Sequence, residues 1–163
     1  MRVRIDEKSN YKAVFFDNGK TIRMNIDPLK SIKTPQHPEI EDVAINSKCE
    51  AGCRYCYVSA VKSGSNFENI IDKAKEVWGS LEMNQRPFQI AIGGAGESTL
   101  HPQWIDFVKT VRELGILPNY TTNGMHLTDE ILDATEKYCG GVAVSWHPHI
   151  EKFFHSSIEK YSK

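Results

Sequence analysis

The sequence lacks any long apolar run and any secretion signal. No apolar stretch in the 163 residues approaches the ~20 residues that a membrane-spanning helix needs. The first eight residues, MRVRIDEK, lack the apolar centre of a signal peptide. We therefore expect a cytoplasmic protein that does not cross a membrane.

An excess of charge of either sign is also missing. Lys and Arg total 20 and Asp and Glu total 21, which leaves a formal net charge of -1. Proteins that bind nucleic acid or membrane surfaces in general show a basic excess or a basic stripe. A general nucleic-acid or membrane-surface binder is therefore not expected, although the balance leaves room for a local groove.

Cysteine is scarce and unevenly placed, with only Cys49, Cys53, Cys56 and Cys139 in the chain. Four such residues are too few and too uneven for a disulfide scaffold. Three of them fall within eight residues, and in a reducing compartment such a cluster favours metal binding over disulfide formation.

The first 38 residues predict a β-hairpin followed by a connector. Residues 11–16 and 21–26 are rich in β-branched and aromatic side chains and flank an Asn18-Gly19 pair, which suits a tight turn. Three prolines then follow within residues 28–38, where no periodicity is evident. We expect residues 1–38 to form this appendage and residues 39–163 to form the core domain.

The core region alternates short strands with helices, which predicts an α/β fold with a parallel sheet and right-handed crossovers. A full (β/α) TIM-type barrel uses about 31 residues per unit, so residues 43–163 hold about four units of a partial barrel. Such sheets place ligand sites at the carboxyl ends of their strands. Strands are expected at 43–46, 88–92, 117–122 and 142–146, and helices at 67–83, 102–114, 128–138 and after Pro148.

The cysteine spacing, Cys49-x3-Cys53-x2-Cys56, allows three thiolates on one loop to reach three corners of a compact iron–sulfur cluster. Four-iron clusters ordinarily take four cysteines, but Cys139 is expected at the opposite, amino-terminal side of the last strand. With three ligands, one iron keeps an open position. A structural zinc site would need a fourth ligand, and the spare histidines His101 and His147 lie far along the chain. Three unrelated buried cysteines would not explain the spacing.

This loop resembles the hallmark of the radical S-adenosylmethionine (SAM) enzymes, C-x3-C-x-aromatic-C, with Tyr55 in the aromatic position. The resemblance implies that Cys49, Cys53 and Cys56 hold a [4Fe-4S] cluster whose fourth iron is chelated by the methionine amino and carboxylate groups of SAM. Reduction then cleaves SAM to a 5'-deoxyadenosyl radical, which abstracts hydrogen from a substrate. It also implies that Tyr55 lies near the adenine.

A glycine-rich loop follows the second expected strand and includes Gly93, Gly94, Gly96 and Glu97. Alone it is weak evidence, but it resembles the family's G-G-E-P segment with two residues inserted before the glutamate and Ser98 in place of the proline. In the family this loop binds the SAM amino group through backbone oxygens. Which glycine makes that contact stays open, as does whether Glu97 orients the ammonium group or stabilises the loop.

Two further strand ends complete the expected site. Thr122 and Asn123 resemble the family's third-strand ending, whose polar side chains approach SAM. Ser145 resembles the polar residue that meets the SAM ribose or carboxylate, although it could instead fill a small gap in the core. His147 and His149 could form a metal pair, but a partly solvated loop is the simpler interpretation.

The sequence therefore predicts a radical SAM enzyme acting on an unidentified substrate, with an electron donor such as flavodoxin or ferredoxin. The family generally uses six βα units, so we expect the core to be truncated at its C-terminus, completed by a partner chain, or a compact variant. Two alternatives remain: a non-catalytic iron–sulfur or electron-transfer module or remnant of such an enzyme, and a binding domain with a vestigial cysteine loop.

Overall fold

The computed structural model describes residues 1–162, which form two sheets with helices. The first sheet is antiparallel, in the order β1-β2-β3, with β1 at Arg2–Asp6, β2 at Tyr11–Phe15 and β3 at Thr21–Asn25. The hairpin predicted from the sequence is β2–β3. Strand β1 was not predicted, because Arg2 and Arg4 occupy the positions that face inward, where a strand pattern normally shows apolar residues.

These two arginines attach the antiparallel sheet to the rest of the protein. Arg4 is 3% exposed, and both guanidinium groups lie over the Phe88 ring, at 4.9 Å for Arg2 and 4.4 Å for Arg4. Their N–H groups donate to main-chain carbonyl oxygens of residues that precede the strands of the second sheet. These acceptors are His37, Pro38, Asn84, Arg86, Pro87 and Gly115.

The second sheet is parallel and its strand order, β4-β5-β6-β7, follows the order along the chain. Such an order, without the reversal of a doubly wound sheet, is typical of a (β/α) barrel. The predicted α/β class with four βα units of a partial barrel is confirmed. The strands are β4 at Ile40–Val43, β5 at Gln89–Ile92, β6 at Leu117–Thr122 and β7 at Gly141–Val144.

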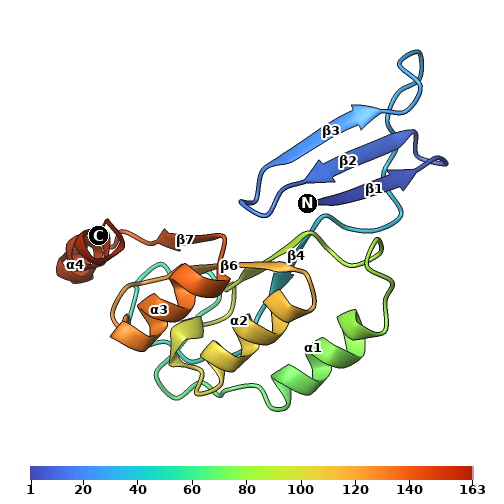
Figure 1. The fold of residues 1–163 in the computed structure, drawn as a ribbon. Coiled ribbons are helices and arrows are strands. Elements are labelled where there is room, and N and C mark those ends of the chain that lie inside the picture. Colours follow the sequence, from blue (N-terminus) through green and yellow to red (C-terminus); the bar gives the residue numbers. More distant parts are fainter. Residues whose placement is uncertain (163) are drawn as a thin grey trace.

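Within residues 1–162, four α-helices follow the strands in turn, and Figure 1 shows α1, α2 and α3 side by side on one face of the parallel sheet. Thr128 caps α3, its hydroxyl accepting from the Ile131 N–H at 3.4 Å. The helices are α1 at Ile70–Gly79, α2 at Trp104–Glu113, α3 at Asp129–Tyr138 and α4 at Glu151–Tyr161, with short 3-10 turns at Ser98–Leu100 and Pro148–Ile150.

Several predicted boundaries were wrong. The first strand of the core was expected to begin at Val43, but it ends there. The helix expected at 67–83 is shorter and begins only at Ile70, because the Phe67 N–H bonds to the Ile45 carbonyl. The helix expected to open at Pro102 begins at Trp104, and the last strand ends at Val144 and not at residue 146.

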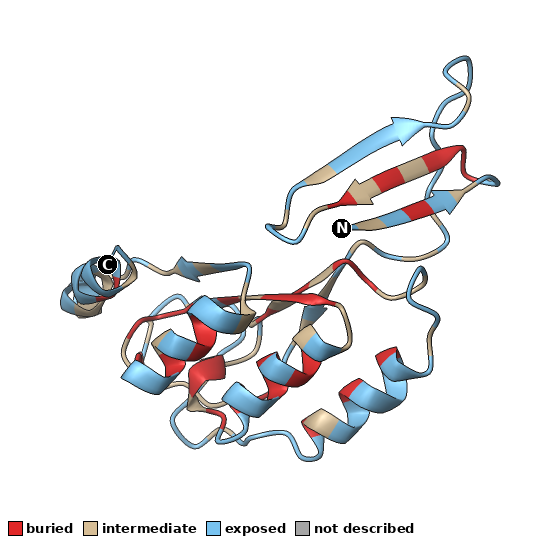
Figure 2. Cartoon of the chain, in the orientation of Figure 1, coloured by how far each residue is buried: buried red, intermediate tan, exposed pale blue. Residues whose placement is uncertain are grey.

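The main core lies between the parallel sheet and its helices, which turn their buried faces toward it (Figure 2). Trp78, Trp104 and Phe107 are all buried there. Cys139 packs against this core just before β7, at the end of the sheet opposite the cysteine loop. No helix in the described part of the chain is long and apolar enough to cross a membrane.

Candidate functional site

The carboxyl ends of the four parallel strands surround a pocket of about 200 Å³. It is lined by every site residue expected from the sequence, although these come from four separate loops. The expected residues in its wall are Cys49, Cys53, Cys56, Tyr55, Gly93, Gly94, Gly96, Glu97, Thr122, Asn123 and Ser145. Parallel strands bring their carboxyl ends to one edge of a sheet, which explains how residues up to 96 positions apart meet.

A second cleft, of about 270 Å³, lies between α1 and β4. Its lining side chains are apolar except for Lys73, so it offers none of the polar and sulfur groups of the first pocket. We therefore take the pocket at the strand ends as the candidate site.

The cysteine loop is a series of tight turns with free, half-buried thiols. The Cys56 N–H donates to the Cys53 carbonyl at 3.2 Å, and Gly52 has a φ of 61°, which favours glycine at this position in the three-residue spacer. Burial raises the pKa of the Cys53 thiol, and the neighbouring Cys49 and Cys56 raise this pKa further. All three cysteines line the same pocket.

Three free thiols on one loop are a donor set that fits an iron–sulfur cluster. In the described part of the chain, no three His, Cys, Asp or Glu side chains are placed to hold one metal ion. A cluster distributes its thiolate ligands over separate irons, so the three thiols need not converge on one point. The Ala60 N–H also points at the Cys56 sulfur, with N and Sγ 3.3 Å apart.

The glycines of the loop after β5 differ in what surrounds them. Gly94 has a φ of 84° and no other atom lies within 4 Å of the point where a side chain would begin. Gly96 instead packs on the start of the cysteine loop, where a methyl group would lie 2.6 Å from the Lys48 carbonyl oxygen. Gly94 therefore leaves space beside the pocket, whereas Gly96 allows two loops to approach closely.

This difference predicts unequal effects of two alanine substitutions on the iron-free protein. Gly96→Ala forces the cysteine loop away and should lower the free energy of unfolding by about 3 kcal/mol. Gly94→Ala meets only the conformational cost of positive φ, about 1 kcal/mol. Urea denaturation measures both, and equal losses would contradict the assigned packing role of Gly96.

Glu97 is buried, at 3% exposure, and its carboxylate is fully engaged by the protein. Oε1 accepts from the hydroxyls of Thr99 at 2.6 Å and Thr122 at 2.8 Å, while Oε2 accepts from the Asn123 N–H at 2.7 Å. Of the two roles left open by the sequence, this favours stabilisation of the loops over direct contact with an ammonium group.

The main chain of Glu97 extends this connection to the cysteine loop. Its N–H donates to the Lys48 carbonyl at 2.8 Å, and its carbonyl accepts from Asn46 Nδ2 at 2.8 Å. Asn46 is 1% exposed and was not predicted as a site residue, because residues 43–46 were expected to be a strand. The available signal was an asparagine directly after an apolar run and just before the cysteines, since a polar side chain there needs a hydrogen-bond partner.

Hydrogen bonds also fix the end of β6. Thr122 is 1% exposed, and its hydroxyl, which donates to Glu97, also accepts from the Gly124 N–H at 3.0 Å. Asn123 Nδ2 lies 3.7 Å from Cys49 Sγ. Both residues line the pocket, but neither presents a free side chain to it.

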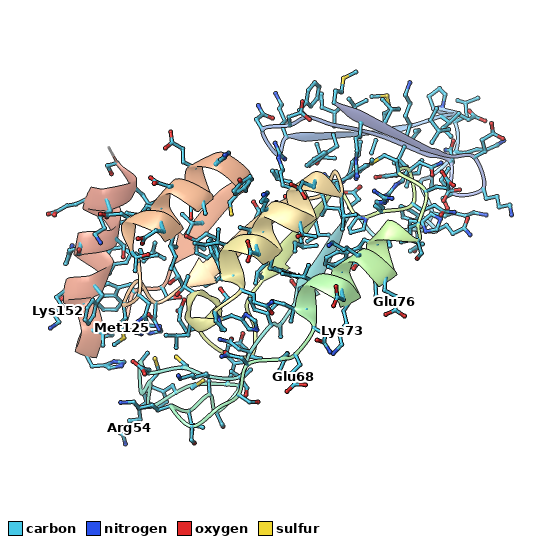
Figure 3. The ribbon with its side chains drawn as sticks, turned by 60° about the horizontal axis from the view of Figure 1, so that its bottom comes forward. Arg54, Glu68, Lys73, Glu76, Met125 and Lys152 are labelled. Atoms are coloured by element: carbon cyan, nitrogen blue, oxygen red, sulfur yellow. The ribbon has the colours of Figure 1, made fainter. Side chains whose placement is uncertain are left out.

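The periphery of the pocket is more open. Tyr55 is 87% exposed, with Arg54 over its ring at 5.6 Å, and Figure 3 shows Arg54 on the outer side of the cysteine loop. The Ser145 N–H donates to the Thr122 carbonyl at 2.8 Å, which fixes the end of β7. His149 Nε2 lies 2.8 Å from the Ala51 carbonyl oxygen, so this histidine contacts the cysteine loop.

Residues 43–150 match the Radical SAM superfamily over most of the parallel sheet and the whole pocket. The chain belongs to this superfamily. Radical SAM proteins use a [4Fe-4S] cluster and SAM as cofactors, and the three cysteines and the open glycine turn of this chain fit that pair.

One curated relative and two solved structures are similar to this chain. The tungsten-containing aldehyde ferredoxin oxidoreductase cofactor-modifying protein of Pyrococcus furiosus is 34% identical over 94 residues, which cover 54% of this chain and 24% of the relative. BtrN in complex with AdoMet (SAM) and 2-DOIA is 25% identical, with a TM-score of 0.56 over 69% of this chain and 47% of BtrN.

SuiB of Streptococcus suis, bound to its precursor peptide SuiA, has a TM-score of 0.58 over 69% of this chain and 25% of SuiB. At 17% identity it supports the fold alone. The chain thus spans about a quarter of the curated relative and half or less of these two radical SAM structures.

Proposed function

We propose that this chain is the cofactor-binding core of a radical SAM enzyme that cleaves SAM reductively. The observation that carries the proposal is the meeting of three free cysteines and an open glycine turn in one pocket at the strand ends. A [4Fe-4S] cluster held there would supply one electron to SAM, whose sulfur–carbon bond would break to give methionine and a 5'-deoxyadenosyl radical for hydrogen abstraction from an unidentified substrate.

In this proposal each group of residues has a separate task. Cys49, Cys53 and Cys56 bind three irons and leave the fourth for SAM. Gly93 and Gly94 line the pocket and would offer their backbone oxygens to the SAM amino group, and at Gly94 nothing lies within 4 Å of the point where a side chain would begin. Tyr55 and Ser145 also line the pocket, where Tyr55 would lie near the adenine of SAM and Ser145 would meet its ribose or carboxylate.

Glu97, Thr122 and Gly96 take supporting tasks. Their contacts join the cysteine loop, the glycine loop and the end of β6 before any cofactor binds. We propose further that residues 39–163 act as the core domain and residues 1–38 as an appendage. A cytoplasmic location with flavodoxin or ferredoxin as electron donor suits an oxygen-sensitive cluster.

Anaerobic reconstitution with iron and sulfide, followed by dithionite and SAM, tests the proposal. The expected results are a four-iron spectrum that changes when SAM is added and release of 5'-deoxyadenosine, measured by liquid chromatography. Heat-denatured protein treated in the same way controls for iron and sulfide in solution.

The other outcomes point to the alternatives. A cluster whose spectrum ignores SAM would indicate an electron-transfer module, and no cluster at all would indicate a binding domain. Tetrahedral zinc in the purified protein would contradict the proposal most directly.

A further inference from the structure

Asn123, which follows β6, is fixed at three points. Its backbone N–H donates to Glu97 Oε2 at 2.7 Å, its side-chain Oδ1 accepts from the Met125 N–H at 2.9 Å, and its Nδ2 lies 3.7 Å from Cys49 Sγ. The residue is 6% exposed, so water does not compete strongly for these groups.

The contact with Met125 settles which end of the amide faces the sulfur. An asparagine amide can be placed in either of two orientations, and its hydrogen-bond partners must decide. The Met125 N–H can bond only to the oxygen, so the NH2 group is the end that points at Cys49. The buried Glu97 carboxylate fixes the backbone from which this side chain extends.

We propose that Asn123 is a positioning residue that donates an N–H···S hydrogen bond to the Cys49 thiolate and thereby raises the reduction potential of the cluster. This inference rests on the proposed function, because it requires Cys49 to be a cluster ligand. Reduction adds negative charge that is shared with the ligand sulfurs, and a donor aimed at a sulfur stabilises the reduced state more than the oxidised state.

This role differs from the direct SAM contact expected from the sequence. Both polar ends of the Asn123 side chain are already engaged, one by Met125 and the other by Cys49. The comparable donor to Cys56 is the backbone N–H of Ala60, which a side-chain substitution does not remove. Substitution of Asn123 can therefore change the reduction potential of the cluster.

Two substitutions remove the donor in different ways. Asn123→Asp keeps the oxygen that accepts from Met125 and replaces the NH2 group with an anionic oxygen, whereas Asn123→Ala removes both contacts. Asn119→Ala is the matched control: it lies on β6, and its amide bonds to Gln89 Oε1 at 3.0 Å, away from the cysteines.

The measurement is an EPR-monitored redox titration of each reconstituted protein without SAM. In Asn123→Ala the ratio of reduced to oxidised cluster at a fixed potential should fall about threefold to tenfold, as expected for one hydrogen bond. A tenfold fall corresponds to about 59 mV for one electron. Asn123→Asp should shift the potential further in the same direction, and Asn119→Ala should leave it unchanged.

An unchanged potential in Asn123 variants with full iron content would overturn this inference and leave the proposed function standing. Absence of a cluster from the unaltered protein would overturn both. Should neither variant fold, unaltered protein labelled with 15N-asparagine decides: a 15N coupling to the reduced cluster in ENDOR supports the N–H···S bond, and no coupling overturns it.

Discussion

Cys53→Ala is expected to take up no stable [4Fe-4S] cluster, whereas Cys139→Ala should take up as much iron as the unaltered protein. Loss of Cys53 leaves two thiols on the loop, and two iron corners then lack a protein ligand. Iron and acid-labile sulfide analysis after anaerobic reconstitution, together with the absorption spectrum, measures the result.

Cys139 is a suitable control because the fold separates it from the other three. It lies between α3 and β7, before the parallel strand begins, whereas the cysteine loop follows the end of β4. Burial also raises the pKa of its thiol to about 12, so the thiolate that binds iron is disfavoured there. Equal iron loss in the two variants would contradict the three-ligand assignment.

Glu97→Ala should have the second largest effect, a loss of about 3–5 kcal/mol in the free energy of unfolding of the iron-free protein. The substitution leaves the hydroxyls of Thr99 and Thr122 and the N–H of Asn123 without their acceptor in a buried place. Each unsatisfied buried donor costs about 1–3 kcal/mol.

Urea denaturation of the iron-free protein measures this loss without any cofactor. Glu136→Ala, an exposed position on α3, is the matched control and should change stability by less than about 0.5 kcal/mol. Glu97→Gln should lie between the two, since it keeps one acceptor. A Glu97→Ala variant as stable as the control would show that the carboxylate is available for some other partner.

The order of strands and helices was predictable because alternation and turn residues are local signals. The bounds of β6 match the expectation at both ends, since Leu117 follows a helix-ending glycine and Asn123-Gly124 closes the strand. The boundary of β4 was not predictable in this way. It is an edge strand that carries Glu41, whose carboxylate accepts from Trp78 Nε1 at 2.9 Å, a partner that only the fold supplies.

The residues that line the candidate site were predictable from the sequence, but the role of each residue was not. The cysteine spacing and the glycine loop are contiguous in sequence and resemble known segments. Two of the donors to the Glu97 carboxylate come from Thr122 and Asn123, 25 and 26 residues later, so only the assembled strand ends show how fully the carboxylate is engaged. The contact between Asn123 and Cys49 spans 74 residues and carries no local signal.

The attachment of the antiparallel sheet through Arg2 and Arg4 determines which residues near this junction can be substituted during evolution. Both guanidinium groups donate hydrogen bonds to backbone carbonyl oxygens, which any amino acid at those positions would supply. Residues such as Asn84 and His37 can therefore be substituted during evolution without loss of these hydrogen bonds, provided that the local backbone conformation is unchanged. Substitution of Arg2 or Arg4 would remove the hydrogen-bond donors. We therefore expect substitutions to be tolerated at the carbonyl positions but not at the two arginines.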